Sequence, residues 1–153
     1  MSVAFAQYPN DFILNGEAVT RKSTGEYPSD WSEIATQTKA DAGNKCVRCG
    51  HVHDITAGYM LTVHHLDLNK SNCKWWNLAA LCQRCHLRIQ GKVVLERPYM
   101  FEHTEWFKPY AAGYYANLNG WPDDREFVLN HVDQLLDYGR PQRLYPTIGE
   151  TMP

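Results

Sequence analysis

Two Cys-x-x-Cys pairs constrain the fold of this chain more than any other feature. The four cysteines are Cys46, Cys49, Cys82 and Cys85. Thiolates spaced in this way suit a closed tetrahedral zinc site of the kind that holds a small fold together. A disulfide framework is the poorer interpretation, because the chain has five cysteines, an odd number, and its start does not resemble an export signal. We therefore predict a structural zinc ion, and we expect Cys73 to be a buried, inert thiol.

Three histidines accompany the cysteine pairs and suggest a second kind of site. His64 and His65 lie between the pairs, and His86 directly follows the second pair. A purely structural zinc site does not need histidines at these positions. Imidazoles suit an open metal site beside a free base, which is a combination that performs hydrolysis. Because neighbouring residues of a strand point to opposite faces, we expect His64 and His65 to have different roles.

Together these residues resemble the HNH (ββα-metal) endonucleases over roughly residues 45–90. The matching segments are Cys46-Val-Arg-Cys49-Gly50, Leu61-Thr-Val-His64-His65-Leu-Asp67, Asn69-Lys-Ser-Asn72, Trp76-Asn77-Leu78 and Leu81-Cys82-Gln-Arg-Cys85-His86. The resemblance implies a treble-clef-like, zinc-stabilised ββα-metal core. It also implies a divalent-metal-dependent enzyme that hydrolyses DNA to 5′-phosphate and 3′-hydroxyl ends.

The resemblance also implies a role for each polar residue of the motif. His65 matches the general base, whereas His64 and His86 match the two protein ligands of one catalytic divalent ion. Mg²⁺ or Mn²⁺ is the expected ion, with Ni²⁺ and Zn²⁺ as alternatives. Asn77 matches the catalytic-site asparagine that ties the loop after His65 to the following helix. Asp67 either orients a histidine or caps the following turn, and we favour the second.

The distribution of charge is compatible with a nucleic-acid partner. The whole chain has a net charge of −2, but residues 39–92 carry eight basic and three acidic side chains, a local charge of +5. Phosphate contacts require local charge of this sign, although an ordinary solvated surface would look the same. We expect double-stranded DNA to be the partner, and cleavage of both strands would usually need a homodimer. The candidate DNA-binding residues are Lys70, Lys74, Arg84, Arg88 and Lys92.

We predict a single α+β domain over residues 1–153 with three parts. Residues 1–44 form an N-terminal hairpin and helix, residues 45–92 the metal-binding core, and residues 93–153 a C-terminal helical extension. In the first part we expect a hairpin turning at Asn15-Gly16 and a helix capped by Asp30 and ending at Gly43. In the core we expect a hairpin turning near Ala57-Gly58, whose second strand covers 59–64, and a helix over 79–90. In the last part we expect a helix over 107–118 and a last helix capped by Asp123 and ending at Gly139. No signal peptide or membrane span is expected, which favours a cytoplasmic protein.

Two other functional classes fit parts of the pattern. A non-catalytic zinc module that binds nucleic acid needs no general base, so the three histidines favour the enzyme. A Cys-x-x-Cys redox protein is weaker still, because redox motifs do not require two pairs with a histidine appended. The aromatic residues between Trp106 and Trp121 can stack bases, but their helical spacing favours a core. His51 and His53 match no motif position, and we expect them on a strand surface.

Overall fold

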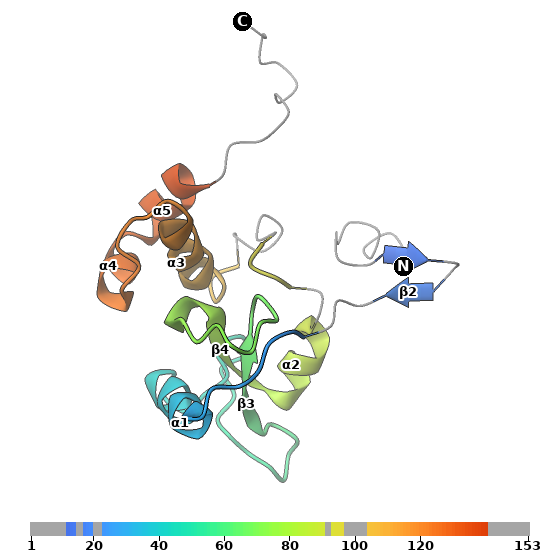
Figure 1. Ribbon diagram of the computed structural model, residues 1–153. Coiled ribbons are helices and arrows are strands. Elements are labelled where there is room, and N and C mark those ends of the chain that lie inside the picture. Colours follow the sequence, from blue (N-terminus) through green and yellow to red (C-terminus); the bar gives the residue numbers. More distant parts are fainter. Residues whose placement is uncertain (1–11, 15–16, 20–22, 91–92, 97–103, 141–153) are drawn as a thin grey trace, which may run out of the picture.

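The structure is a computed structural model that describes residues 12–14, 17–19, 23–90, 93–96 and 104–140. It mixes helices with two separate two-stranded sheets, which confirms the α+β class (Figure 1). In the N-terminal sheet, β1 (Phe12–Leu14) pairs antiparallel with β2 (Glu17–Val19). Leu14 lies opposite Glu17, so two residues connect the strands. This hairpin was predicted from Asn15-Gly16, which favours a two-residue turn.

Helix α1 (Trp31–Asp41) begins where the sequence predicts it, but the predicted capping box does not form. Asp30 occupies the position before the helix with φ −95° and ψ 19°, and its side chain makes no capping bond. A capping side chain needs an extended backbone at this residue. The backbone oxygen of Asp30 instead accepts from the N–H groups of Glu33 and Ile34. The chain then leaves the helix through Gly43, whose φ of +67° suits glycine.

The central unit is a hairpin followed by a helix, but its strands differ from those predicted. Strand β3 (Leu61–His65) pairs antiparallel with β4 (Leu78–Cys82), and α2 (Gln83–Ile89) follows directly. The predicted helix over 79–90 was therefore wrong in its first turn. Residues 78–82 are all buried, and a short apolar run of this kind has no periodicity that separates strand from helix. The turn near Ala57-Gly58 exists, but it is closed by a single bridge between Asp54 and Tyr59.

A 3-10 helix, η2 (Trp75–Asn77), leads into β4 and contacts the first of the C-terminal helices. Helix α3 (Lys108–Leu118) packs on it with Pro109 in its first turn, as predicted. A Cβ at Gly113 of α3 would lie 2.5 Å from the Cβ of Trp76, so glycine permits this close approach. The fully buried Phe107 and Leu81 show that α3 and the central hairpin share one core.

The last predicted helix is two helices in the structure. Helix α4 (Arg125–Asn130) and helix α5 (Val132–Gly139) are separated at His131, whose φ is −132°. The cap also differs from the prediction: the side chain of Asp124 accepts from Phe127 N–H at 2.9 Å, whereas Asp123 accepts from the Trp76 indole at 3.1 Å. Among the described helices, none has both the length and the apolar character needed to cross a bilayer.

Candidate functional site

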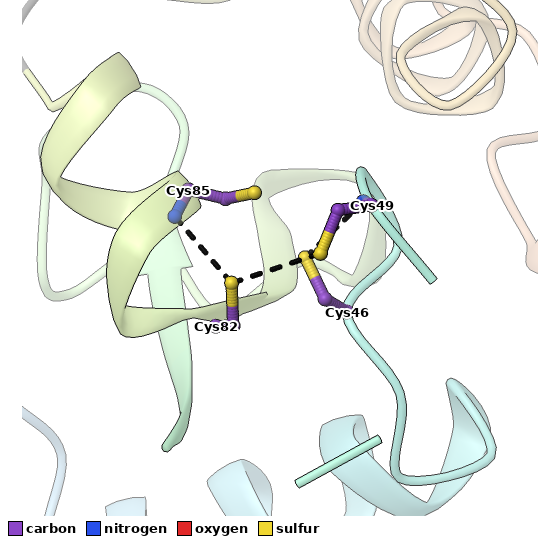
Figure 2. Close-up of side chains that lie close together, drawn as sticks. All are labelled: Cys46, Cys49, Cys82 and Cys85. Atoms are coloured by element: carbon purple, nitrogen blue, oxygen red, sulfur yellow. Dashed lines mark hydrogen bonds between the residues drawn. The ribbon is translucent and has the colours of Figure 1, made fainter. Parts of the chain in front are cut away.

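The two cysteine pairs converge at the junction between the segment after α1 and the start of α2. The four sulfur atoms lie within 4.8 Å of one another, and their side chains point toward a common centre (Figure 2). Cys46 and Cys49 come from a tight turn in which Gly50 N–H bonds to the Cys46 carbonyl at 2.8 Å. Cys82 ends β4, and Cys85 lies in the first turn of α2. Cys49 is exposed and the other three are buried.

This geometry fits a tetrahedral metal ion. Four thiolates bound to one zinc at about 2.3 Å lie roughly 3.8 Å apart. The sulfur atoms of Cys49 and Cys82 are separated by 3.8 Å. Backbone N–H groups also point at sulfur, from Cys49 to Cys46 and from Cys85 to Cys82, both at 3.5 Å. The cluster can therefore hold a metal ion such as zinc, as the spacing predicted.

The pKa values of the cysteine thiols also indicate that the cluster needs a bound cation. Burial raises the pKa of Cys85 to about 12, despite a guanidinium bond from Arg48 at 3.4 Å. Burial also opposes ionisation of Cys46, but backbone hydrogen bonds from Cys49, Cys82 and Arg48 outweigh it and lower its pKa to about 7. Four thiolates this close repel one another, so they ionise together only when a cation neutralises them. Cys73 lies outside the cluster and is half-buried, so the expected burial was only partly right.

The histidines gather on the same hairpin and helix but form a different site. His64 Nδ1 lies 3.0 Å from His86 Nε2. Two imidazole nitrogens bound to one ion at 2.0–2.1 Å lie roughly 2.9 to 3.4 Å apart, depending on coordination geometry. The pair can therefore share one ion. A cavity of about 100 Å³ opens beside them and is bordered by both rings and by His65.

Thr62 determines which nitrogen of His86 is available. The Thr62 hydroxyl donates to the Leu81 carbonyl at 2.9 Å, so it accepts from His86 Nδ1–H at 3.0 Å. His86 Nε2 then keeps its lone pair toward His64. In metal sites, a hydrogen bond to one ring nitrogen commonly orients the other nitrogen in this way. Thr62 was missed in the sequence, although its position two residues before His64 on one strand places both on the same face.

His65 lies at the end of β3 and is held by aromatic rings from a distant segment. The centroid of its ring lies 4.8 Å from the ring centroid of Trp31 and 5.8 Å from that of Tyr27. His65 as a whole is 6% exposed, and its buried Nε2 has no hydrogen-bond partner in the described structure. Burial lowers the pKa of His65, partly offset by the charge of Asp67. Burial also lowers the pKa of His64 to about 3, so both imidazoles are mainly neutral at pH 7.

A buried amide organises the loop between β3 and β4. Asn77 is fully buried and accepts from Asp67 N–H at 2.8 Å. Its Nδ2 donates to Asp67 Oδ1 and to the Asn72 carbonyl, both at 2.8 Å. Asp67 also accepts from Asn69 N–H at 2.8 Å, so it caps the turn, as we favoured. The loop that follows His65 is therefore fixed to the start of β4.

The candidate DNA-binding residues do not form one free surface. Lys74 lies 3.7 Å from Asp123, and Arg84 donates to the Ala57 carbonyl at 2.9 Å. Lys70 borders the histidine cavity, and Arg88 is exposed on α2. Lys92 lies outside the described residues. Only part of the predicted set is thus placed near the histidines.

His51 and His53, which we expected on a strand surface, have structural contacts. His51 stacks on Tyr59 with ring centroids 3.5 Å apart, and His53 Nδ1 accepts from Leu61 N–H at 2.9 Å. Most of the aromatic residues between Trp106 and Trp121 pack in or against the core, as predicted. Tyr27 and Trp31 beside His65 were not predicted as site residues, because nothing in their local sequence links them to a histidine more than thirty positions away.

Comparison with known proteins gives a partial match. A stretch of 82 residues, 54% of this chain, is 30% identical to the Zorya protein ZorE of Escherichia coli. The match spans 22% of the length of ZorE, so most of that protein has no counterpart in the aligned region. No protein-family model and no solved structure matches the chain.

Proposed function

We propose that this protein is a divalent-metal-dependent endonuclease of the HNH class that hydrolyses DNA to 5′-phosphate and 3′-hydroxyl ends. The observation that carries the proposal is the histidine cavity. His64 and His86 lie 3.0 Å apart, and His65 borders the same cavity. The strand–strand–helix order of β3, β4 and α2 supports it, because the resemblance requires this order.

In this proposal the three histidines divide the work. Burial lowers the pKa of His65 and keeps it mainly neutral at pH 7, and its buried Nε2 has no hydrogen-bond partner in the described structure, so we assign His65 the lone pair that takes a proton from the attacking water. His64 and His86 hold the catalytic ion, Mg²⁺ or Mn²⁺. When bound, such an ion supplies charge that polarises the phosphate and stabilises the leaving oxygen. Asn77 holds the loop after His65 in place.

The four cysteines have a structural role in the proposal. They hold Zn²⁺ and so join the segment after α1 to β4 and α2, next to the catalytic histidines. Double-stranded DNA is the proposed substrate, with the exposed Arg88 of α2 and with Lys74 as phosphate contacts outside the cavity. Such contacts position a duplex without reading its sequence.

Metal-dependent plasmid nicking tests the proposal. Purified protein is freed of loosely bound ions by gentle chelation and incubated with supercoiled plasmid, with and without Mg²⁺ or Mn²⁺. We expect nicking with added ion that His65→Ala slows by about two to four orders of magnitude and that His131→Ala retains, because His131 bonds to Phe127 in a different part of the fold. Protein that binds plasmid but never nicks it would instead be a non-catalytic zinc module.

A further inference from the structure

A segment outside the zinc-binding core completes the histidine site. Residues 23–27, the crossing segment, run over the loop that follows β3. Thr24 N–H bonds to the Leu68 carbonyl at 2.8 Å, and Lys70 N–H bonds to the Thr24 carbonyl at 2.9 Å. Gly25 has φ +71°, and a Cβ there would collide with the side chain of Asn69. The crossing segment is therefore held tightly against the loop.

This contact places Tyr27 beside the candidate general base. The Tyr27 ring stacks on Trp31 with centroids 5.0 Å apart, and Tyr27 as a whole is 52% exposed. The ammonium of Lys70 lies 5.1 Å from the centre of the same ring. Tyr27, Lys70 and the three histidines all border the cavity of about 100 Å³. Among the described residues at this cavity, Lys70 is the one lysine or arginine.

We propose that Lys70 is a catalytic residue that contacts the scissile phosphate, and that Tyr27 is its positioning residue. This inference rests on the proposed function. Negative charge increases on the phosphate during hydrolysis, and an ammonium group at the cavity edge can stabilise it together with the catalytic ion. Lysine is flexible, and a cation–π contact with Tyr27 holds its charge beside His65.

The roles of Lys70 and Arg88 are separated by measuring cleavage and binding independently. Cleavage is measured in single turnover with excess protein and Mn²⁺, and DNA affinity by fluorescence anisotropy without added divalent ion. Lys70→Ala should slow cleavage about 100-fold, as loss of one transition-state donor does, while DNA affinity falls less than about threefold. Lys70→Arg should recover most of the rate. Arg88→Ala should instead weaken binding, and the control His131→Ala, outside the cavity, should keep both the rate and the affinity.

Tyr27 is tested by removing its ring or only its hydroxyl. Tyr27→Phe keeps an aromatic face and should cleave at the wild-type rate. Tyr27→Leu should slow cleavage about two- to fivefold, which corresponds to an exposed cation–π contact, and should have no effect when Lys70 is already alanine. Tyr138→Leu is the control, since Tyr138 is 78% exposed on α5. Melting temperatures of all variants show whether folding is kept.

The outcomes that overturn the inference differ from those that overturn the proposed function. If wild-type protein cuts no DNA, the endonuclease proposal fails and the role of Lys70 with it. If wild-type protein cuts DNA and Lys70→Ala cuts equally fast, or loses rate only through weaker binding, Lys70 is not catalytic although the enzyme is real. If Tyr27→Phe is as slow as Tyr27→Leu, the hydroxyl matters and the cation–π role of Tyr27 is wrong.

Discussion

The cysteine cluster and the histidine cluster lie on the same hairpin and helix, but they differ in what they leave open. The cysteines supply four donors to one centre, so a tetrahedral ion there has no free position. The histidines supply two facing nitrogens beside a cavity of about 100 Å³, so an ion bound there would have further positions free. A closed donor set stabilises a fold, and an open one permits chemistry.

The difference also extends to how each cluster is supported. The cysteines are supported by local backbone bonds, from residues three positions away, at 3.5 Å. The histidines depend on distant partners: Thr62 orients His86, and Trp31 and Tyr27 enclose His65. We therefore expect substitutions in the first cluster to change folding, and substitutions in the second to change activity. The following predictions test that expectation.

Loss of one cysteine ligand should have the largest effect. Cys82→Ser should give unfolded or insoluble protein, because zinc binding and folding are linked and a structural zinc contributes on the order of 10 kcal/mol. Cys73→Ser is the matched control, since Cys73 lies outside the cluster, and it should be nearly silent. Circular dichroism and zinc content of the soluble protein are measured. Folded Cys82→Ser without zinc would mean that the cluster does not stabilise the fold.

Replacing the candidate base should have the largest effect on activity alone. His65→Ala should cleave about two to four orders of magnitude more slowly, which is the usual contribution of a positioned base. Its zinc content and its affinity for Mn²⁺ should be unchanged. Because burial lowers the pKa of His65, wild-type activity should decline only as pH falls below 6.5. Calorimetry with Mn²⁺ and a plasmid assay across pH check both points.

The two candidate ligands should respond differently from His65. His64→Ala and His86→Ala should bind Mn²⁺ roughly 100-fold more weakly, since removal even of a ligand's hydrogen-bond partner costs about 10- to 100-fold. Higher Mn²⁺ should partly restore cleavage, and zinc content should not change. Calorimetry is the measurement. Loss of Mn²⁺ binding in His65→Ala, with normal binding in His64→Ala, would exchange the two roles.

Removing the buried amide should weaken both folding and activity. Asn77→Ala leaves the Asp67 N–H and the Asn72 carbonyl without their Asn77 partner, which should cost about 3 kcal/mol of unfolding free energy. Cleavage should fall as well, because the loop after His65 loses its attachment. Asn119→Ala is the control, since Asn119 ties α3 to Gly139 far from the histidines. Urea unfolding and cleavage below the transition are compared; equal cleavage in both variants would remove Asn77 from the site.

Substitution of outer basic residues should have the smallest effect. Arg88→Ala should weaken DNA binding similarly for all sequences and lower the salt slope by about 1. Lys74→Ala should change less, because Lys74 is paired with Asp123 at 3.7 Å. Anisotropy titrations over a range of salt concentrations measure both. Unchanged slopes for the double variant would place DNA on another surface.

Local patterns predicted the parts of the fold that depend on nearby residues. The Asn15-Gly16 hairpin, α1 and α3 were all predicted, because turn chemistry and helical periodicity are local properties. The missed elements depend on burial. Residues 78–82 form a strand because they pair with β3 inside the core, and the last helix divides at His131. Neither strand pairing nor burial can be predicted from the pattern of neighbouring residues alone.

Residue types and their spacing were enough to indicate the donor sets of this protein. Cysteine and histidine spacing indicated one group of four thiols and one group of three imidazoles, since the chemistry of a ligand belongs to its residue type. The surroundings of these donors depend on how the chain packs. The fold placed Tyr27, Trp31 and Lys70 around His65 and oriented His86 through Thr62. These contacts join segments far apart in the chain, and such proximity is set by packing rather than by spacing.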